Sequence, residues 1–251
     1  MSPLKYVPTT FLFGVLVLLF PASALAQKND YFDRTNLVYL EFNFGSNDPD
    51  DNSDIYDFLE NESTFDRDDL DGFAFDFKVY YQLNNRISLG GAVTAYEEDT
   101  TVENLDFVDI NGRPIFNTTT LDTTWIGGQI IWTPFGAGET FGTRGWAPKF
   151  FVPYLSAGVG FKVWEFHQDG EFVDQTDPND PFIFADRFES DGEAFSTRLG
   201  AGFRLNLHKN VDLNFQLQRD WGEDDLEGSF IGFGELDLGS QSGFVGVTIR
   251  L

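Results

Sequence analysis

The sequence predicts an all-β fold: an eight-stranded antiparallel up-and-down transmembrane β-barrel that follows a cleaved signal peptide. Three observations lead to this prediction. A short apolar segment stands at the N-terminus, eight later segments alternate apolar and polar residues, and the acidic residues concentrate in four of the connections between them.

The first 26 residues have the three parts of a secretory signal peptide. Lys5 supplies a positive charge, an apolar run extends from Phe11 to Phe20, and Ala24-Leu25-Ala26 offers a small–x–small cleavage site. The run is shorter than the roughly 20 apolar residues that a transmembrane helix needs. We therefore expect a signal peptide over residues 1–26 and an outer-membrane β-barrel domain over residues 27–251.

Eight segments of the remaining chain place apolar side chains at every second position, which is typical of strands with one apolar face. In the second segment, for example, Phe73, Phe75 and Phe77 alternate with a polar face. Most segments have about the 9–11 residues that a tilted membrane strand needs. Two further segments either extend the strands above the membrane or form extra hairpins, which would give ten strands. They are Phe182–Phe188 and Ser229–Leu238. The eight segments are 37–45, 72–83, 86–96, 123–132, 153–164, 195–207, 211–221 and 244–251.

Short and long connections alternate along the chain. Asn84-Asn85 and His208–Asn210 make short turns, and the Gly-rich segment 133–149 is a longer connection on the same side. The four other connections hold 33 of the 41 acidic residues and three of the 16 basic ones; they are 46–71, 97–122, 167–194 and 222–240. An even number of strands then places both termini with the short turns, and the acidic loops outside the cell.

The polar face of the strands suits the inside of a closed barrel. It carries charges of both signs in an otherwise acidic chain, together with small residues such as Gly158, Gly160, Gly200 and Gly202. Eight strands leave a lumen just wide enough for side chains to fill, and buried charges must pair. The alternative is a soluble, lipocalin-like binding barrel with the apolar face inside. The predicted lumen ion network comprises Glu41, Asp76, Lys78, Lys162, Arg198, Arg204, Asp212, Asp220 and Arg250.

Aromatic residues at the strand ends predict the girdles that flank the apolar band of a membrane barrel. Trp125, Trp164 and Trp221 fall at the outer ends, and Tyr81 and Trp132 at the inner ends. Arg219 has apolar-face parity near the outer rim, where it meets either a lipopolysaccharide phosphate or an acid of a loop.

Composition excludes several function classes. A net charge of −25 argues against nucleic-acid binding, and the lack of cysteine excludes disulfides, thiolate metal sites and a Cys nucleophile. The two histidines, His167 and His208, stand in no G-x-S-x-G or H-E-x-x-H motif. We therefore expect no enzymatic activity.

The acidic connections suit hydration and self-repulsion, and their carboxylates are also ligands for Ca²⁺ or Mg²⁺. The EF-hand pattern fails, because Ile55 and Asn61 stand where that loop needs Gly and Glu. No cofactor is expected beyond loosely held Ca²⁺ or Mg²⁺. The weak metal candidates are Asp50, Asn52, Asp54, Asp66, Asp68 and Asp69.

The chain resembles the small eight-stranded outer-membrane barrels of the OmpA, OmpX and OmpW type, with porin-like strands. The resemblance rests on Pro153-Tyr154-x-x-x-Gly158-x-Gly160, on the strand Leu199–Arg204, and on the last strand Gly243–Leu251, which ends in Leu rather than the usual aromatic residue. It implies a Gram-negative cell outer membrane, contact with its lipids and lipopolysaccharide, and insertion by the barrel-assembly machinery.

The expected function is a structural or surface-interaction role for a barrel with a largely plugged lumen and long acidic extracellular loops. The alternative is a narrow channel for ions or small solutes, as the resemblance to OmpW implies. A lipid-modifying outer-membrane enzyme is the third hypothesis.

Overall fold

The computed structural model describes residues 32–33, 37–50, 52–109, 111–142, 145–174 and 182–251. The signal peptide predicted for residues 1–26 lies outside them. Within the described residues, every helix is too short or too polar to cross a membrane.

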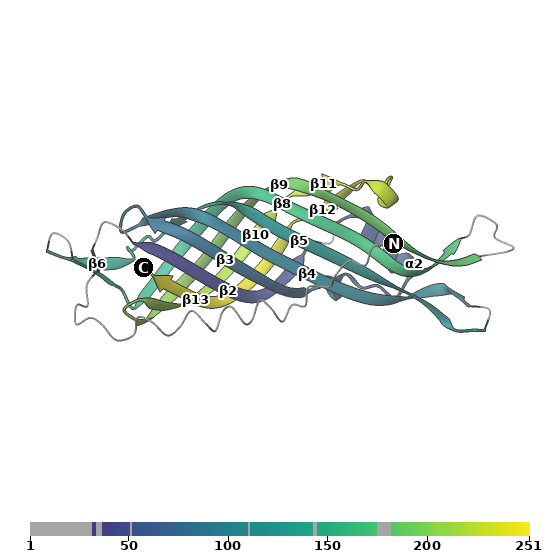
Figure 1. The fold of residues 1–251 in the computed structure, drawn as a ribbon, viewed down its shortest axis with the longest axis horizontal. Coiled ribbons are helices and arrows are strands. Elements are labelled where there is room, and N and C mark those ends of the chain that lie inside the picture. The colour runs from purple at the N-terminus through teal and green to yellow at the C-terminus, as the bar shows by residue number, and fades with distance from the viewer. Residues whose placement is uncertain (1–31, 34–36, 51, 110, 143–144, 175–181) are drawn as a thin grey trace, which may run out of the picture.

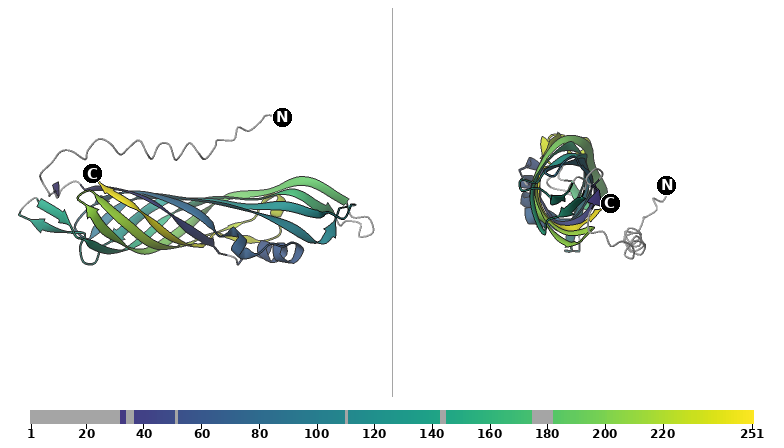
Figure 2. Two further views of the ribbon diagram at one scale, coloured as in Figure 1. Left: turned by 90° about the horizontal axis from the view of Figure 1, so that it is seen from below. Right: turned by 90° about the vertical axis from the view of Figure 1, so that its left-hand side faces the viewer.

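Eight antiparallel strands close into a barrel, visible as a ring in the end-on view of Figure 2. Closure comes from the last strand, which pairs with β10 on one side and with the first strand of the barrel, β2, on the other. The eight-strand alternative is therefore the one found in the described chain. In ring order the strands are β10 (Val211–Trp221), β13 (Ser240–Arg250), β2 (Val38–Pro49), β3 (Gly72–Gln82), β4 (Ile87–Val108), β5 (Pro114–Trp132), β8 (Phe151–Asp174) and β9 (Phe182–His208).

The barrel wall is taller on one side than on the other (Figure 1). Strands β4, β5, β8 and β9 have 19 to 27 residues, whereas the other four have 11 or 12. Much of 97–122 and 167–194, expected as loops, is therefore strand, and Phe182–Phe188 extends β9. Parts of these stretches are polar on both faces, as in Glu97–Thr101, so they lack the continuous alternation that reveals a membrane strand.

The connections of the short wall fold into a cap, which we define as residues 52–71 and 222–239. It contains α2 (Asp54–Glu62), the 3-10 helices η2 (Arg67–Leu70) and η3 (Gly228–Phe230), and the hairpin of β11 (Glu223–Asp225) and β12 (Glu235–Asp237). Segment 229–238 thus forms no barrel hairpin. Acidic Asp54 and Asp57 in the first turn of α2 favour its dipole, and its buried face is Ile55, Tyr56 and Leu59. We call this end of the barrel the cap end.

The opposite end, which we call the turn end, carries the short turns and the C-terminus (Figures 1 and 2). Here β1 (Phe32–Asp33), β7 (Gly145–Pro148) and β6 (Gly138–Phe141) form a small sheet. The Gly-rich connection lies on this side, as expected, and brings Trp146 beneath the barrel. Its indole Nε1 donates to Asn85 Oδ1 at 3.1 Å.

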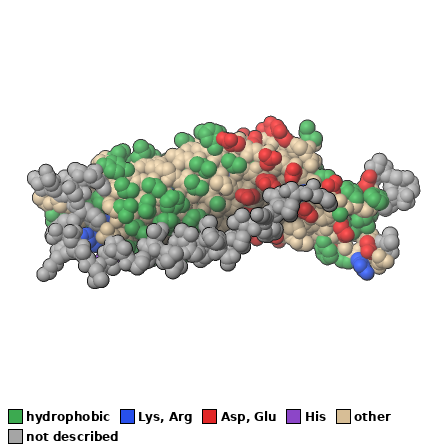
Figure 3. Space-filling view, viewed as in Figure 1, with side chains coloured by type: hydrophobic (Ala, Val, Ile, Leu, Met, Phe, Trp, Pro, Cys, Tyr) green, Lys and Arg blue, Asp and Glu red, His purple; other side chains and the backbone are tan. Residues whose placement is uncertain are grey.

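The apolar face of the barrel points outward. Phe44, Phe161 and Leu199 are each more than half exposed, whereas the polar residues between them are buried. Figure 3 shows apolar side chains gathered over the turn-end half of the barrel and acidic side chains over the cap-end half. This is the reverse of a soluble binding barrel, and it defines an apolar band on the outer wall.

Candidate functional site in the barrel interior

The barrel interior contains all nine residues of the predicted ion network, each at most 3% exposed. They form three groups stacked along the barrel axis, and Arg198 Nη1, 3.9 Å from Asp76 Oδ1, links the second group to the third. Alternation along each strand places them there, because every second side chain points into the lumen.

The group at the turn end joins β13 to β10. Arg250 Nη2 pairs with Asp212 Oδ1, and Arg250 Nη1 donates to the carbonyl of Lys209 at 2.6 Å. The Arg250 guanidinium lies 5.9 Å from the ring of Trp146. Below this pair the interior is closed by apolar side chains, including Leu37, Ile131 and Val152.

The central group is built around Glu41. Its carboxylate lies 2.9 Å from Lys78 Nζ and accepts a hydrogen bond from Tyr80 Oη at 2.7 Å; Lys78 also lies 3.0 Å from Asp76. Arg204 Nε is 3.5 Å from Glu41. The Arg204 guanidinium lies 4.7 to 5.7 Å from the centres of three aromatic rings, those of Tyr39, Tyr80 and Tyr154. Such an arrangement stabilises a desolvated cation.

The third group lies nearest the cap. Arg198 donates from Nε and Nη2 to the two carboxylate oxygens of Asp220, at 2.6 and 2.7 Å, and lies 3.8 Å over the ring of Trp125. Lys162 Nζ is 3.9 Å from Asp220 and donates to the carbonyl of Leu238 at 2.5 Å. Because Leu238 belongs to the cap, this bond joins the cap to the polar interior.

Above Lys162 an apolar core fills the barrel mouth. Side chains of the cap, such as Ile55, Leu59 and Phe230, pack against Trp164 and Phe166 on the tall wall. The space beside Lys162 has a volume of about 10 Å³, which is room for about one water molecule.

The predicted aromatic girdles need a correction. Tyr81, Trp132 and Trp221 lie on the outer wall, 40 to 47% exposed, but Trp125 and Trp164 point inward and are at most 2% exposed. Trp125 stacks on Arg198, and Trp164 Nε1 donates to Asp224 of the cap at 2.8 Å. Trp164 is two residues from Lys162 on the same strand, so both side chains point to the same face. The alternation therefore indicates that Trp164 points into the lumen.

Just above the apolar band, acids of neighbouring strands stand side by side on the tall wall. Glu97 is paired with Asp122, Asp122 with Glu165, and Glu165 with Asp191, across β4, β5, β8 and β9. We call these four residues the acidic row. Lost hydration at the wall, with the carboxylates of Glu97 and Glu165, raises the pKa of Asp122.

Two basic side chains reach the acidic row at Glu165. Arg187 Nη2 lies 2.7 Å from its carboxylate and His167 Nδ1 lies 3.2 Å from it. His208 ends β9 at the opposite end of the barrel. Arg219, on the short wall, pairs with Asp50 at 2.6 Å, which is the loop-paired alternative for this residue.

The weak metal candidates take part in local structure. Asp66 and Asp69 form a capping box around η2, with Asp66 also accepting from the Asp68 backbone, and Asp50 binds Arg219. Asn52 and Asp54 are exposed at the start of α2. In the part of the chain that the structure describes, no three His, Asp or Glu side chains gather in a way that could hold a metal ion.

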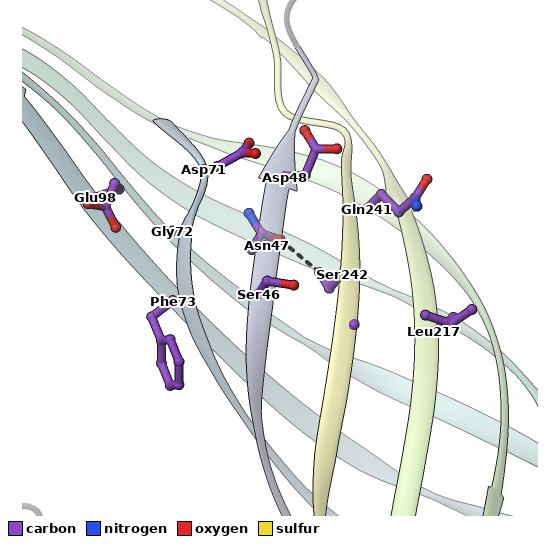
Figure 4. A pocket seen from close by; sticks show the side chains of 11 residues that line it. Ser46, Asn47, Asp48, Asp71, Gly72, Phe73, Glu98, Leu217, Gln241 and Ser242 are labelled. Carbon is purple, nitrogen blue, oxygen red and sulfur yellow. Dashed lines mark hydrogen bonds between the residues drawn. The ribbon is translucent and has the colours of Figure 1, made fainter. Parts of the chain in front are cut away.

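A groove of about 660 Å³ indents the outer wall where β2, β3 and β13 meet the cap (Figure 4). Small residues such as Ser46 and Gly243 create it, and Asp48, Asp71 and Glu98 line it. Beneath the groove the wall is continuous: β2 pairs with β13 from Tyr39 to Pro49, and Asn47 accepts from Ser242 Oγ at 2.7 Å. The groove is therefore an indentation and opens no path into the lumen.

Comparison with known proteins identifies the class. Residues 13–234 match the family model described as the outer membrane protein beta-barrel domain, and the chain belongs to this family. The protein is accordingly an outer-membrane protein. No curated protein matches the sequence.

Several solved structures are similar at low identity. Neisserial surface protein A has 11% identity and a TM-score of 0.44, over 85% of this chain and 97% of that one. OprG from Pseudomonas aeruginosa has 11% identity and a TM-score of 0.42, over 87% and 97%. Ail of Yersinia pestis, in complex with the heparin analogue sucrose octasulfate, has 12% identity and a TM-score of 0.35, over 86% and 97%.

Proposed function

We propose that the protein is a plugged outer-membrane barrel with a structural or surface-interaction role, which presents the cap and the tall wall outside the cell. The observation that carries this proposal is the filled interior. Three groups of buried ion pairs occupy the lumen, with apolar cores at both ends. A permeating ion would have to displace paired, desolvated charges, which is costly.

The channel alternative has less support. A lateral opening in the wall would favour it, but the groove in Figure 4 lies over strands that remain paired. An eight-stranded barrel is also narrow enough for side chains to fill it.

An enzymatic role finds little support in the geometry. His167 contacts Glu165 and stands across from Thr120, 8% exposed, on β5. A hydrolase needs a nucleophile within reach of its base, together with donors that stabilise an oxyanion. Glu165 is instead shared with Arg187, as in a surface ion pair.

The acidic row supports a second element of the proposal, contact with lipopolysaccharide. Its carboxylates lie side by side just above the apolar band, where like charges repel each other across strands. Ca²⁺ or Mg²⁺ held loosely between these acids and lipid phosphates would relieve this repulsion. The proposal also includes insertion of the mature chain, residues 27–251, by the barrel-assembly machinery.

The test is planar-bilayer conductance of the mature chain, refolded in micelles and confirmed as folded by faster gel mobility before boiling. A general porin inserted in parallel serves as the positive control. We expect no resolved conductance steps under conditions where the porin gives them. Discrete steps from the folded protein, abolished by boiling, would overturn the plugged barrel in favour of the narrow channel.

A further inference from the structure

A cleft at the cap end lies beside the apolar core of the barrel mouth and shares Leu59 and Phe230 with it. Its volume is about 440 Å³, and it lies between α2, the upper parts of β8 and β9, and residues 229–233. This volume falls in the range of small-molecule sites, which is about 300–1,000 Å³. Its position above the apolar band keeps it away from the lipid tails.

Phenylalanine rings dominate the lining of this cleft. Phe172 and Phe188 meet edge to face with centroids 4.6 Å apart, and on the other side Phe58 lies 5.2 Å from Phe233. Phe230 connects the two sides, at 6.5 Å from Phe188 and from Phe233. Phe58 remains 45% exposed. Contiguous apolar surface outside a membrane marks an interaction site, because water otherwise covers it at a cost.

The cleft has an unpartnered buried acceptor and two carboxylates among its described lining residues. Asn117 Oδ1 is buried and accepts no hydrogen bond from any described residue. Glu62 and Glu171 also line the cleft, and neither forms an ion pair within the described structure. No Lys, Arg or His stands among the lining residues. A fitting ligand therefore donates hydrogen bonds and carries positive charge.

We propose that this cleft binds small organic cations with an apolar or aromatic body, such as arylalkyl ammonium ions. The ring faces would attract the cation through their quadrupoles, and the apolar body would cover the rings. Asn117 Oδ1 accepts an N–H of the ligand, while Glu62 and Glu171 supply the opposite charge. The same two carboxylates disfavour fatty acids and phosphates. The inference goes beyond the plugged barrel and is independent of conductance.

The test uses the mature chain in nanodiscs of zwitterionic lipid, which avoids detergent in the cleft. Three probes share a phenyl body and differ in charge: 2-phenylethylammonium, neutral 2-phenylethanol and anionic 3-phenylpropanoate. Binding is measured by isothermal titration calorimetry, with saturation-transfer NMR to detect contact with the phenyl protons. We expect saturable binding of the cation, at least tenfold weaker binding of the alcohol, and no binding of the carboxylate.

Variants separate the cleft from unspecific attraction to an acidic protein. Glu171→Gln and Phe172→Ala should each weaken binding of the ammonium probe at least fivefold. Glu139→Gln removes one exposed charge from β6 at the turn end and should leave it unchanged. Heat-modifiable gel mobility confirms that each variant retains the barrel.

The proposal fails if the alcohol binds as well as the ammonium ion, because the cleft is then merely apolar. It fails equally if Glu139→Gln weakens binding as much as Glu171→Gln, or if no probe saturates. None of these results depends on whether the lumen conducts.

Discussion

Asp220→Asn is expected to destabilise the barrel strongly, because it removes the carboxylate that Arg198 and Lys162 share. Arg198 donates two hydrogen bonds to Asp220, and Lys162 lies 3.9 Å away; all three side chains are at most 4% exposed. Removing one member of a buried ion pair typically costs about 3–5 kcal/mol. This corresponds to at least a 100-fold change in the unfolding equilibrium, since about 1.4 kcal/mol is tenfold.

The matched control is an ion pair of the same strand in a different environment. Arg187 and Glu189 of β9 lie 3.2 Å apart but are 45% and 62% exposed. An exposed pair contributes about 0.2–1 kcal/mol. Glu189→Gln should therefore have at most this effect.

The assay is urea unfolding of the mature chain in lipid vesicles, followed by tryptophan fluorescence. The double variant Arg198→Met with Asp220→Leu should recover part of the lost free energy of unfolding, because it removes both charges of the Arg198–Asp220 pair while Lys162 still lacks Asp220. A double-mutant cycle then gives the coupling energy. If Asp220→Asn costs no more than Glu189→Gln, the lumen is hydrated and the argument for a plugged interior is refuted.

Three further predictions concern the wall and the turn end. The raised pKa of Asp122 means that the fold favours its protonated form. The resulting contribution to stability is complete below the ordinary Asp pKa of about 3.9, and it is lost as the pH rises through the raised pKa. Asp122→Asn should therefore unfold at higher urea than wild type at pH 7 and at the same urea below pH ~4; a constant difference would contradict this. Gly160→Ala would place a Cβ 2.3 Å from a backbone oxygen of β5 and should cost about 1–3 kcal/mol in urea unfolding, whereas outward-facing Gly91→Ala should be nearly neutral; equal effects would contradict close packing. Trp146→Ala, at a side chain only 1% exposed, should cost about 3–5 kcal/mol by the same measurement, and a loss below about 1 kcal/mol would show that the turn end is not sealed.

The membrane part of the fold could be predicted because one property repeats there. The outward face of β3 needs apolar side chains at Phe73, Phe75 and Phe77, and lipid on one side imposes this along all eight strands. The upper arms of β8 and β9 contact water and the cap, and their phenylalanines, such as Phe172 and Phe188, gather in the cleft rather than along one continuous apolar face. Backbone pairing of these arms needs no particular side chains, so their sequence lacks a regular alternation of apolar and polar residues.

The cap was missed for a different reason. Ile55, Tyr56 and Leu59 form one helical face, but they are embedded in an acidic segment whose mean composition resembles a loop. Only nine residues are helical, too few for a clear period of 3.6. The aromatic cleft was missed because its phenylalanines come from distant segments that the tertiary fold brings together.

The charged interior could be predicted as a set but not as pairs. Arg198 and Asp220 face each other in the hairpin of β9 and β10, but counting back from the turn does not predict this pair. A β-bulge between Val211 and Asp212 shifts the register by one residue. Glu41 and Lys78 are also opposite each other, but the cap connects their strands, and its length does not fix the register.

The placement of the cap has a consequence for the order of folding. The second cap segment, 222–239, immediately precedes β13, and β13 closes the ring by pairing Arg250 with Tyr39, near the opposite end of the described barrel sequence. This contact has the largest loop-closure entropy of any strand pair in the described barrel, so its formation is intrinsically slow. Until it forms, the apolar side chains of the cap lack Phe244 of β13, which is part of their core. Sealing of the mouth and closure of the ring are therefore one cooperative event, and an intermediate with open strands exposes both an unpaired edge and an incomplete cap.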